Sequence, residues 1–371
     1  MARVLVGMSG GVDSSVAAWL LKERGHDVCG VTMLLHGTPD DDSDVARDVG
    51  DARRVAALLG IGHLVVDLTT EFRASVVEAF AASYEAGLTP NPCVVCNRLV
   101  KFGLLLDRAR DLGFDLLATG HYARVEPEPG TGADARVRLL KASDPSKDQS
   151  YFLCMLSQRQ LASALLPLGP LAKSEVRAIA ERQGFPTARK RESQDICFVP
   201  DGDYLAFLER LRGGPYPGGP VVTADGTVVG THRGIAACTI GQRKGLGIAL
   251  GEPAYVCAKD AASNTVTMGP AESLMARTCT VDRWNWVAPP ASAATPLRAR
   301  VRTHYRHTEQ PATVVPLPGG GVRVEFDEPQ RAMAPGQFAV AYDGDEVLGG
   351  GAIAQTGRTA GPGTPSERFS L

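Results

Sequence analysis

The turn at residues 7–15, with the sequence GMSGGVDSS, constrains this chain more than any other feature. It follows the apolar run 4–6 and precedes an amphipathic run, residues 14–24, that ends at Gly25. A strand, a glycine-rich turn and a helix in this order aim free backbone N–H groups at a phosphate. No Lys-Ser or Lys-Thr pair closes the turn, so it is not a Walker A loop. The sequence therefore predicts a phosphate site at the first strand of an α/β fold.

The SGGVDS core of this turn resembles the SGGxDS pyrophosphate loop of the ATP pyrophosphatase family. The resemblance implies a loop that grips the β- and γ-phosphates of ATP and makes AMP esters. Gly10 and Gly11 carry no Cβ, so the backbone can bend sharply and approach an anion. Asp13 is placed to organise a cation or the loop itself. The alternative is an ordinary glycine and serine turn before a Rossmann-like helix.

Composition limits the protein class. A chain of 371 residues predicts two or three domains, and 44% hydrophobic with 22% charged residues is typical of a globular protein. The net charge of -2 gives no global attraction to nucleic acid, so RNA binding has to come from local basic patches. We find no signal peptide and no apolar run of membrane-spanning length, which predicts a cytoplasmic protein without membrane association. There, its eight cysteines are not expected to form a structural disulfide framework.

The N-terminal half alternates short β-branched runs with helical patterns. This alternation predicts a doubly wound parallel sheet, with ligands at the carboxyl ends of its strands. Expected strands are residues 3–8, 27–34, 63–68 and 115–122. Expected helices are residues 14–24, 44–59, 71–86 and 95–112.

The second half changes pattern after about Leu161, with short helices expected at 173–183 and 204–211. A Gly/Pro-rich stretch follows at 213–220, and short alternating runs after it suggest β-barrel architecture. The expected division is an ATP-binding catalytic domain at 1–161, to which 192–205 returns, a small mixed central domain at 162–266, a C-terminal β-barrel at 267–358, and a disordered tail at 359–371.

Two cysteines, Cys93 and Cys96, stand near the start of an expected helix, after Asn91 and Pro92. The positive end of the helix dipole favours thiolate, and Arg98 and Lys101 would act in the same direction. A lowered thiol pKa is therefore expected here. Half of a zinc knuckle is the alternative, although no second C-x-x-C completes a closed site. Cys197, taken alone, reads as a buried strand cysteine.

Six ordered motifs change this interpretation: SGGVDSS, NPCVVCNRLVKF, ATGHYAR, KDQSYFL, SQDICF and GQRKGLG. Together they resemble the tRNA-specific 2-thiouridylase family, and the match extends from about residue 3 to residue 354. That family is a sulfurtransferase that adenylates the C2 carbonyl oxygen of the wobble uridine and then displaces AMP with sulfur. The resemblance implies ATP, with Mg²⁺ expected, as the cofactors. It implies the anticodon region of tRNA and a cysteine desulfurase or sulfur-relay protein as partners.

Residue roles follow from the same resemblance. Cys96 matches the family nucleophile, and Cys197 matches the cysteine that carries the persulfide, so that a Cys96–Cys197 disulfide is one expected product. The expected ATP contacts are Gly7, Met8, Ser9, Gly10, Gly11, Val12, Asp13, Ser14, Met33 and Gly120. Contacts with the target base or the rest of the tRNA are expected at Asn91, Pro92, Cys93, His121, Lys147, Asp148, Gln149, His304, Tyr305 and Gln337.

The chain departs from the family at Cys93, where many members carry Asp. An acid–base role for that carboxylate would pass to the thiol or vanish, and Asp13 is the other possible accessory group. An iron–sulfur cluster on Cys93, Cys96 and Cys197 is a minority hypothesis, since such clusters need thiolate ligands.

Three other functions share part of the pattern. An amidating synthetase would share the loop but would not need Cys96 and Cys197. A non-catalytic RNA-binding module would not need an intact phosphate loop. A 4-thiouridine synthase would carry an RNA-binding domain before the loop, and we see none.

Overall fold

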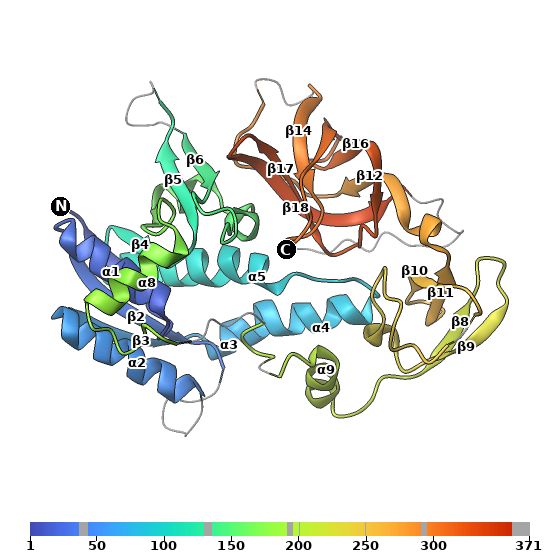
Figure 1. Ribbon diagram of the computed structural model, residues 1–371, viewed down its shortest axis with the longest axis horizontal. Helices are drawn as coiled ribbons and strands as arrows, with labels where there is room; N and C mark the ends of the chain where they lie inside the picture. Colours follow the sequence, from blue (N-terminus) through green and yellow to red (C-terminus); the bar gives the residue numbers. More distant parts are fainter. Residues whose placement is uncertain are drawn as a thin grey trace.

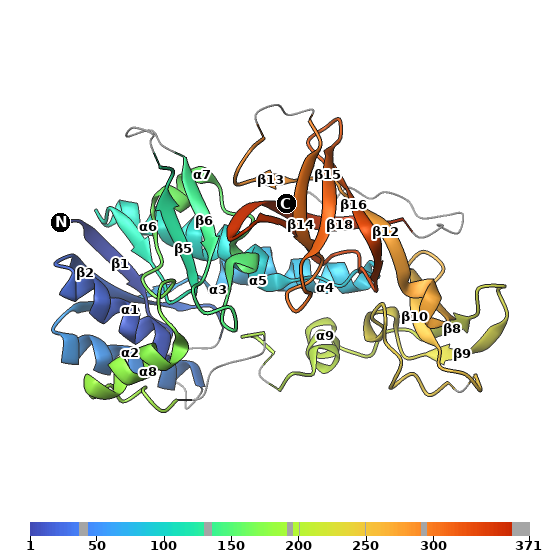
Figure 2. The same cartoon turned by 45° about the horizontal axis from the view of Figure 1, so that its top comes forward.

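The computed structural model describes residues 1–36, 44–129, 136–190, 196–199, 201–248, 250–290 and 295–357. An α/β unit lies at the N-terminal end, a small β unit lies at the opposite end, and a C-terminal barrel lies above the helices that join them (Figure 1). Both helices α4 (Glu78–Glu85) and α5 (Pro92–Cys96) lie between the N-terminal sheet and the small β unit, and a second view shows the same arrangement (Figure 2).

The first sheet is parallel throughout, in the order β3-β2-β1-β4-β7. Its strands are β1 (Arg3–Gly7), β2 (Asp27–Leu34), β3 (Gly62–Asp67), β4 (Leu116–Ala118) and β7 (Ala164–Leu165). Side chains of β1 alternate between two buried clusters, with Leu5 on one face and Val4 and Val6 on the other. Both faces of the sheet are therefore covered, as parallel sheets require.

Two groups of helices cover these faces. One face packs against α1 (Val12–Glu23), α2 (Asp44–Leu59) and α8 (Lys173–Arg182). The other packs against α3 (Thr69–Phe72), the π-helix η1 (Arg73–Val77), α4, α5, the π-helix η2 (Asn97–Leu104) and α6 (Leu105–Asp111). The predicted doubly wound sheet is confirmed, and the predicted helices at 71–86 and 95–112 each contain a π-helical stretch that periodicity did not reveal.

Short elements connect this unit to the rest of the chain. They are the hairpin β5 (Ala123–Pro127) and β6 (Val137–Lys141), the 3₁₀ turn η3 (Ser150–Leu153) and α7 (Gln158–Ala162). A single residue pair, Leu140 with Glu346, joins β6 to the C-terminal sheet.

The small β unit follows α9 (Tyr204–Arg212) and has the strand order β10-β11-β8-β9. Its elements are β8 (Gly219–Val222), β9 (Val228–His232), the 3₁₀ turn η4 (Ile235–Ala237), β10 (Tyr255–Asp260) and β11 (Thr265–Gly269). Val221, Val256 and Val266 are buried completely in its core.

The C-terminal unit is a barrel, because β12 pairs with both β16 and β18 and so closes the sheet. Its elements are η5 (Ala271–Leu274), β12 (Met275–Val281), β13 (Asn285–Trp286), β14 (Leu297–Arg302), β15 (Gln310–Pro316), β16 (Val322–Arg331), β17 (Phe338–Asp343) and β18 (Glu346–Thr356). The predicted C-terminal β-barrel is confirmed.

Two expected boundaries are wrong. The boundary after Leu161 separates β7 and α8 from the sheet that they complete, since Val176 and Ile179 of α8 pack with Val4 and Val6 of β1. The boundary after residue 266 cuts through β11, which continues to Gly269. Part of the returning segment 192–205 and the whole tail 359–371 lie outside the described residues. Within the described ranges, no helix is long and apolar enough to cross a membrane.

Candidate active site

The glycine turn has the geometry of an anion site. Gly10 has a φ of +67°, and a Cβ there would lie 2.4 Å from the carbonyl oxygen of Asp48, so only glycine fits. Helix α1 begins after Gly11 with no side-chain cap, which leaves its first N–H groups free of side-chain acceptors. Free N–H groups at a helix N-terminus favour a phosphate.

Serine hydroxyls hold the shape of this turn. The Ser14 hydroxyl accepts a hydrogen bond from the Ser9 N–H at 3.2 Å and donates to the Gly11 carbonyl at 3.2 Å. The Ser15 hydroxyl donates to the same carbonyl at 2.8 Å. Ser14 and Ser15 are buried, whereas Ser9 is exposed and remains accessible to a ligand.

Asp13 is occupied by a cation from the protein itself. The Lys173 ammonium donates to both carboxylate oxygens, at 2.7 and 2.8 Å, and the Tyr122 hydroxyl donates to one of them at 2.7 Å. Asp13 is expected to organise either a cation or the loop itself. Its contact with the Lys173 ammonium pairs it with a cation and also fixes the loop. Both carboxylate oxygens of Asp13 therefore already have partners within the protein.

Lys190 ties the turn to α2. Its ammonium donates to the Gly10 carbonyl at 3.0 Å and to the carboxylates of Asp48 and Asp51 at 2.6 Å each. Lys190 belongs to the basic run Arg189-Lys190-Arg191, and these contacts use its charge inside the protein. Arg191 lies outside the described residues.

The residues after β4 join the glycine turn to the cysteine helix. A Cβ on Gly120 would lie 2.9 Å from the Ser14 nitrogen, so this residue packs directly on the start of α1. His121 follows, hydrogen-bonded through Nδ1 to the Thr119 hydroxyl at 2.7 Å, with its ring 6.1 Å from that of Phe102 in η2. Burial, together with the charge of Lys101, holds the pKa of His121 well below its usual value. The residue is therefore a neutral imidazole at physiological pH.

Helix α5 carries both cysteines of the C-x-x-C motif. The Asn91 side chain caps it by accepting from the Val94 N–H at 3.4 Å, and Pro92 occupies its first turn. Cys93 is exposed, whereas Cys96 is only 6% exposed. Their different exposure follows from the helix, which turns Cys96 toward the core shared with Phe102.

Cys197 is an exposed residue in a turn, so the expectation of a buried strand cysteine is wrong. Its neighbour Phe198 anchors the turn by edge-on packing against Phe72 and Phe80, with ring centroids 5.6 and 5.3 Å apart. The His36 side chain, just beyond β2, forms a hydrogen bond with the Cys197 backbone. Cys197 is thus held at the carboxyl end of the first sheet.

The pKa values of Cys93, Cys96 and Cys197 show that the three thiols influence one another and that none has the lowered pKa expected. Cys93 and Cys197 reach the surface, but the protein around them still desolvates their thiols and raises the pKa of both. Burial raises the pKa of Cys96 to about 12, whereas the Lys101 ammonium lowers the pKa of all three. The charges of Cys93 and Cys197 also act on Cys96, so the three sulfurs share one site. The expectation of a lowered thiol pKa is wrong, because desolvation outweighs the helix dipole and Lys101.

All eight cysteines are free, including Cys96 and Cys197. In the part of the chain that the structure describes, no group of three or more His, Cys, Asp or Glu side chains is arranged to hold a metal ion. The three thiols therefore do not form a ready ligand set for an iron–sulfur cluster, and the cluster gains no support from this geometry.

Residues of the KDQ motif lie mainly inside the protein. Asp148 is buried and accepts hydrogen bonds from the Ala142 and Ser150 N–H groups, and the Arg302 guanidinium lies 3.5 Å away. Gln149 accepts from the Tyr122 N–H at 2.9 Å. Direct contact between the Asp148 side chain and tRNA is not available in this conformation, since its oxygens are used internally. Lys147 is half-buried beside them.

The C-terminal candidates approach the same region from the barrel. Tyr305 packs its ring 4.4 Å from that of Phe152, and His304 stacks on His307 at 5.2 Å. Gln337 donates to the Thr89 carbonyl at 3.0 Å, next to the start of α5. These residues lie in connections of the barrel, between β14 and β15 and before β17.

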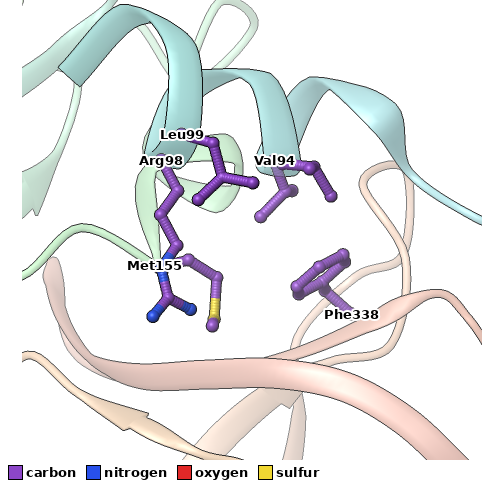
Figure 3. A pocket seen from close by; sticks show the side chains of 6 residues that line it. Val94, Arg98, Leu99, Met155 and Phe338 are labelled. Atoms are coloured by element: carbon purple, nitrogen blue, oxygen red, sulfur yellow. The ribbon is translucent and has the colours of Figure 1, made fainter. Parts of the chain in front are cut away.

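Helix α5 and η2 meet the barrel around a small cavity (Figure 3). Val94 and Leu99 face Met155 and Phe338 across it, with the Arg98 side chain beside them. Its volume is about 10 Å³, room for about one water molecule. The barrel therefore packs closely on the cysteine helix around this cavity.

Comparison with known proteins decides the family. Three family models match successive parts of the chain: a tRNA methyl transferase HUP domain at residues 2–201, a tRNA methyl transferase PRC-barrel domain at 206–270 and an aminomethyltransferase beta-barrel domain at 276–353. A tRNA-specific 2-thiouridylase from Geotalea uraniireducens is 48% identical over 95% of this chain and 94% of its own length. The corresponding protein of Chloroflexus aurantiacus is 50% identical over 96% of this chain and 99% of its own. The chain belongs to the tRNA-specific 2-thiouridylase family.

Among solved structures, a U34-tRNA thiolase from Methanococcus maripaludis with its [4Fe-4S] cluster covers 57% of this chain and 66% of its own, with 18% identity and a TM-score of 0.34. A likeness this low does not transfer the cluster to the present chain.

Within the family framework, three residues of the site escaped the sequence reasoning. Lys173 begins α8, and Gln160 of α7 donates hydrogen bonds to the Arg98 and Phe102 carbonyls behind the cysteines, whereas His36 precedes a stretch without a recognisable pattern. None of them stands in a motif, and only the charge of Lys173 offered a signal.

Proposed function

We propose that this protein is a tRNA 2-thiouridylase that uses ATP to activate the C2 oxygen of the wobble uridine and then replaces it with sulfur. The observation that supports this most is one continuous site. Gly120 packs on the phosphate turn, and the adjacent His121 lies beside the helix that carries Cys96, with Lys101 acting on His121 and on all three thiols.

In the first step, the uracil O2 attacks the α-phosphorus of ATP and pyrophosphate leaves. The free N–H groups at the start of α1 would stabilise the charge on the departing pyrophosphate. Lys173 holds Asp13, and Lys190 holds Gly10, so the turn is organised before ATP arrives. Met33 and Gly120 are the proposed contacts to the adenosine side, and Mg²⁺ is expected to accompany ATP.

In the second step, a persulfide on Cys197 delivers its outer sulfur to C2, and AMP leaves with the former O2 oxygen. The Cys96 thiolate then attacks the inner sulfur of Cys197. The electron pair of the broken S–S bond stays with the sulfur on C2, giving 2-thiouridine and a Cys96–Cys197 disulfide. A thiol reductant closes the cycle, and a desulfurase or relay protein reloads Cys197 with sulfur.

Exposure supports this division of roles. Cys197 is exposed, as a sulfur acceptor must be, whereas Cys96 is buried, where a thiol attacks only a neighbour. Asn91, Pro92 and Cys93 form the proposed turn for the target base. Lys147, Gln149, His304, Tyr305 and Gln337 are the proposed tRNA contacts, and a cytoplasmic location is part of the same proposal.

The test is product analysis with purified protein, tRNA transcript, ATP and a persulfide donor. We expect AMP and pyrophosphate in a 1:1 ratio with 2-thiouridine, and none without tRNA. ADP and orthophosphate would refute the mechanism. AMP formation without tRNA would instead favour an amidating synthetase, and absence of ATP binding would favour a non-catalytic RNA-binding module.

The phosphate turn has a matched test of its own. Gly10→Ala introduces a Cβ 2.4 Å from the Asp48 carbonyl, whereas Gly25→Ala, at a φ of +80°, meets nothing within 4 Å. Both variants carry the left-handed strain, but only Gly10→Ala distorts the turn. We expect at least about a tenfold loss of ATP affinity for Gly10→Ala alone, measured by calorimetry. Equal affinities would exclude this turn as the ATP site.

A further inference from the structure

The segment between α4 and α5, residues 87–91, is held by both of the later units. Thr89 uses both of its backbone groups in contacts to one turn of the barrel. Its N–H donates to the Pro335 carbonyl at 2.8 Å, and its carbonyl accepts from the Gln337 side chain at 3.0 Å. The segment leads directly to Asn91, which caps the cysteine helix.

Gly336 lies at the centre of this contact. Its φ is +91°, and a Cβ there would lie 2.9 Å from the Thr89 nitrogen and 3.0 Å from the Leu88 Cβ. The turn is itself fixed to β18, because the Gly336 N–H donates to the Ile353 carbonyl at 2.8 Å and the Ile353 N–H donates to the Gln337 carbonyl at 2.7 Å. Movement of the barrel strand would therefore move Thr89.

The small β unit holds the other end of the segment. The Lys259 ammonium donates to the Cys238 carbonyl at 2.7 Å and to the Leu88 carbonyl at 3.5 Å. Gly87 has a φ of +76°. A Cβ added to this glycine would lie 3.6 Å from the Ile235 side chain and 3.6 Å from the Lys259 Cβ, so both residues pack directly on it. In Figure 1, α4 ends beside the small β unit, and the chain turns there and runs back to α5; β10 of that unit contains Lys259.

We propose that these contacts form an inter-domain clamp on residues 87–91, with Gly336 and Lys259 as positioning residues for the turn that meets the target base. The clamp depends on the proposed function in one respect: Asn91–Cys93 are taken to be the turn that meets the target base. The barrel and the small β unit thereby fix the segment that leads to the proposed base turn. The base turn adopts its reactive position only while both units are docked on it.

The physical reason is the sensitivity of the reaction to small displacements. A misplacement of about 1 Å, even from a substitution far from the chemistry, costs up to about a hundredfold in rate. The cap on α5 is a single hydrogen bond of 3.4 Å from Val94 to Asn91, so the helix start depends on the position of the chain before it.

The test compares Gly336→Ala with Gly319→Ala. Gly319 has a nearly equal φ of +87°, lies in the turn between β15 and β16, and has nothing within 4 Å of an added Cβ. Both variants place a side chain at nearly the same positive φ. Backbone strain alone should therefore lower the melting temperature of both variants equally. Lys259→Met is the second variant, in case Gly336→Ala does not fold.

Two measurements decide the outcome. Hydrogen–deuterium exchange in residues 87–97 should rise in Gly336→Ala and Lys259→Met and stay at the wild-type level in Gly319→Ala. The single-turnover thiolation rate at saturating tRNA should fall about ten- to a hundredfold in the first two, with tRNA affinity unchanged. The clamp is refuted if exchange and rate in both variants equal those of Gly319→Ala. If wild-type protein forms no 2-thiouridine, the proposed function fails, while the exchange comparison still decides the clamp.

Discussion

At the scale of single residues, the two proposed sulfur-handling cysteines differ in surroundings. Cys96 is buried and Cys197 is exposed, so loss of the first also removes a packed sulfur atom. Cys279, buried in the barrel core, provides a matched control for that packing loss.

We predict that Cys96→Ala and Cys197→Ala each lower 2-thiouridine formation by at least about a thousandfold, because each removes a sulfur that must form a bond. Cys279→Ala should lose stability similar to Cys96→Ala and retain activity. Nucleoside analysis, with tRNA binding measured in parallel, checks both. Wild-type rates in either active-site variant would exclude the proposed cysteine roles.

Lys101 is the charge that opposes burial at all three thiols. Its ammonium lowers the pKa of Cys93, Cys96 and Cys197, so Lys101→Met should raise each of them further. Because thiolate is the reactive form, the rate at neutral pH should fall and the ascending limb of the pH–rate profile should move to higher pH. Lys101→Arg keeps the charge and should restore the wild-type profile. A profile that does not move in Lys101→Met would assign Lys101 to structure alone.

At the scale of elements, the π-helix η2 determines how Lys101 meets the cysteines. A π-turn joins residues i and i+5, and Lys101 stands five residues after Cys96, on which its charge acts. The Gln160 side chain donates to the carbonyls of Arg98 and Phe102, both at 2.8 Å, and thereby satisfies backbone groups of the widened helix.

We predict that Gln160→Leu destabilises the fold by about 1–3 kcal/mol, since it removes both of these hydrogen bonds, and that it also lowers thiolation. Gln160 completes the capping box of α7 with Ser157, so Ser157→Ala is the control that disturbs the cap and spares η2. Its cost should be about 1 kcal/mol without an effect on activity at saturating substrate. Chemical denaturation and single-turnover rates separate the two; equal activity losses would contradict the role given to η2.

At the scale of the whole molecule, Lys259 connects the small β unit to the catalytic unit at an energetic cost. Burial lowers its pKa to about 8, so the folded state binds this proton less tightly than the unfolded chain. Stability should therefore rise with pH between about 8 and 10.4, by up to about 3 kcal/mol from this group. Below pH 8 the full penalty applies.

Lys259→Met removes this titration. The difference between wild-type and variant unfolding free energies should be independent of pH below about 7 and should shift in favour of the wild type as the pH rises toward 10. Denaturation at several pH values measures this difference. Subtracting the unfolding free energy of the variant from that of the wild type cancels the contributions of cysteine and tyrosine side chains that titrate in the same pH range. A constant difference across that range would show that Lys259 is not desolvated in solution.

The sequence by itself determined the parts that depend on neighbours along the chain. The strand–turn–helix at residues 7–15 predicted the phosphate turn, because glycine at positive φ and a helix N-terminus are local properties. Hydrophobic periodicity predicted the parallel sheet, and β2 and α2 have the bounds expected. The ordered motifs predicted the family, which the relatives confirm.

Only the tertiary structure decided what depends on burial and on contacts between distant segments. The pKa of Cys96 rises because the core surrounds it, which helix position alone could not indicate. Asp13 finds its cation in Lys173, 160 residues away. Asp148 has its oxygens inside the fold, and Thr89 is held by a turn of the barrel. Desolvation and long-range pairing have no periodic signature in a sequence, so these properties emerge only when the chain is packed.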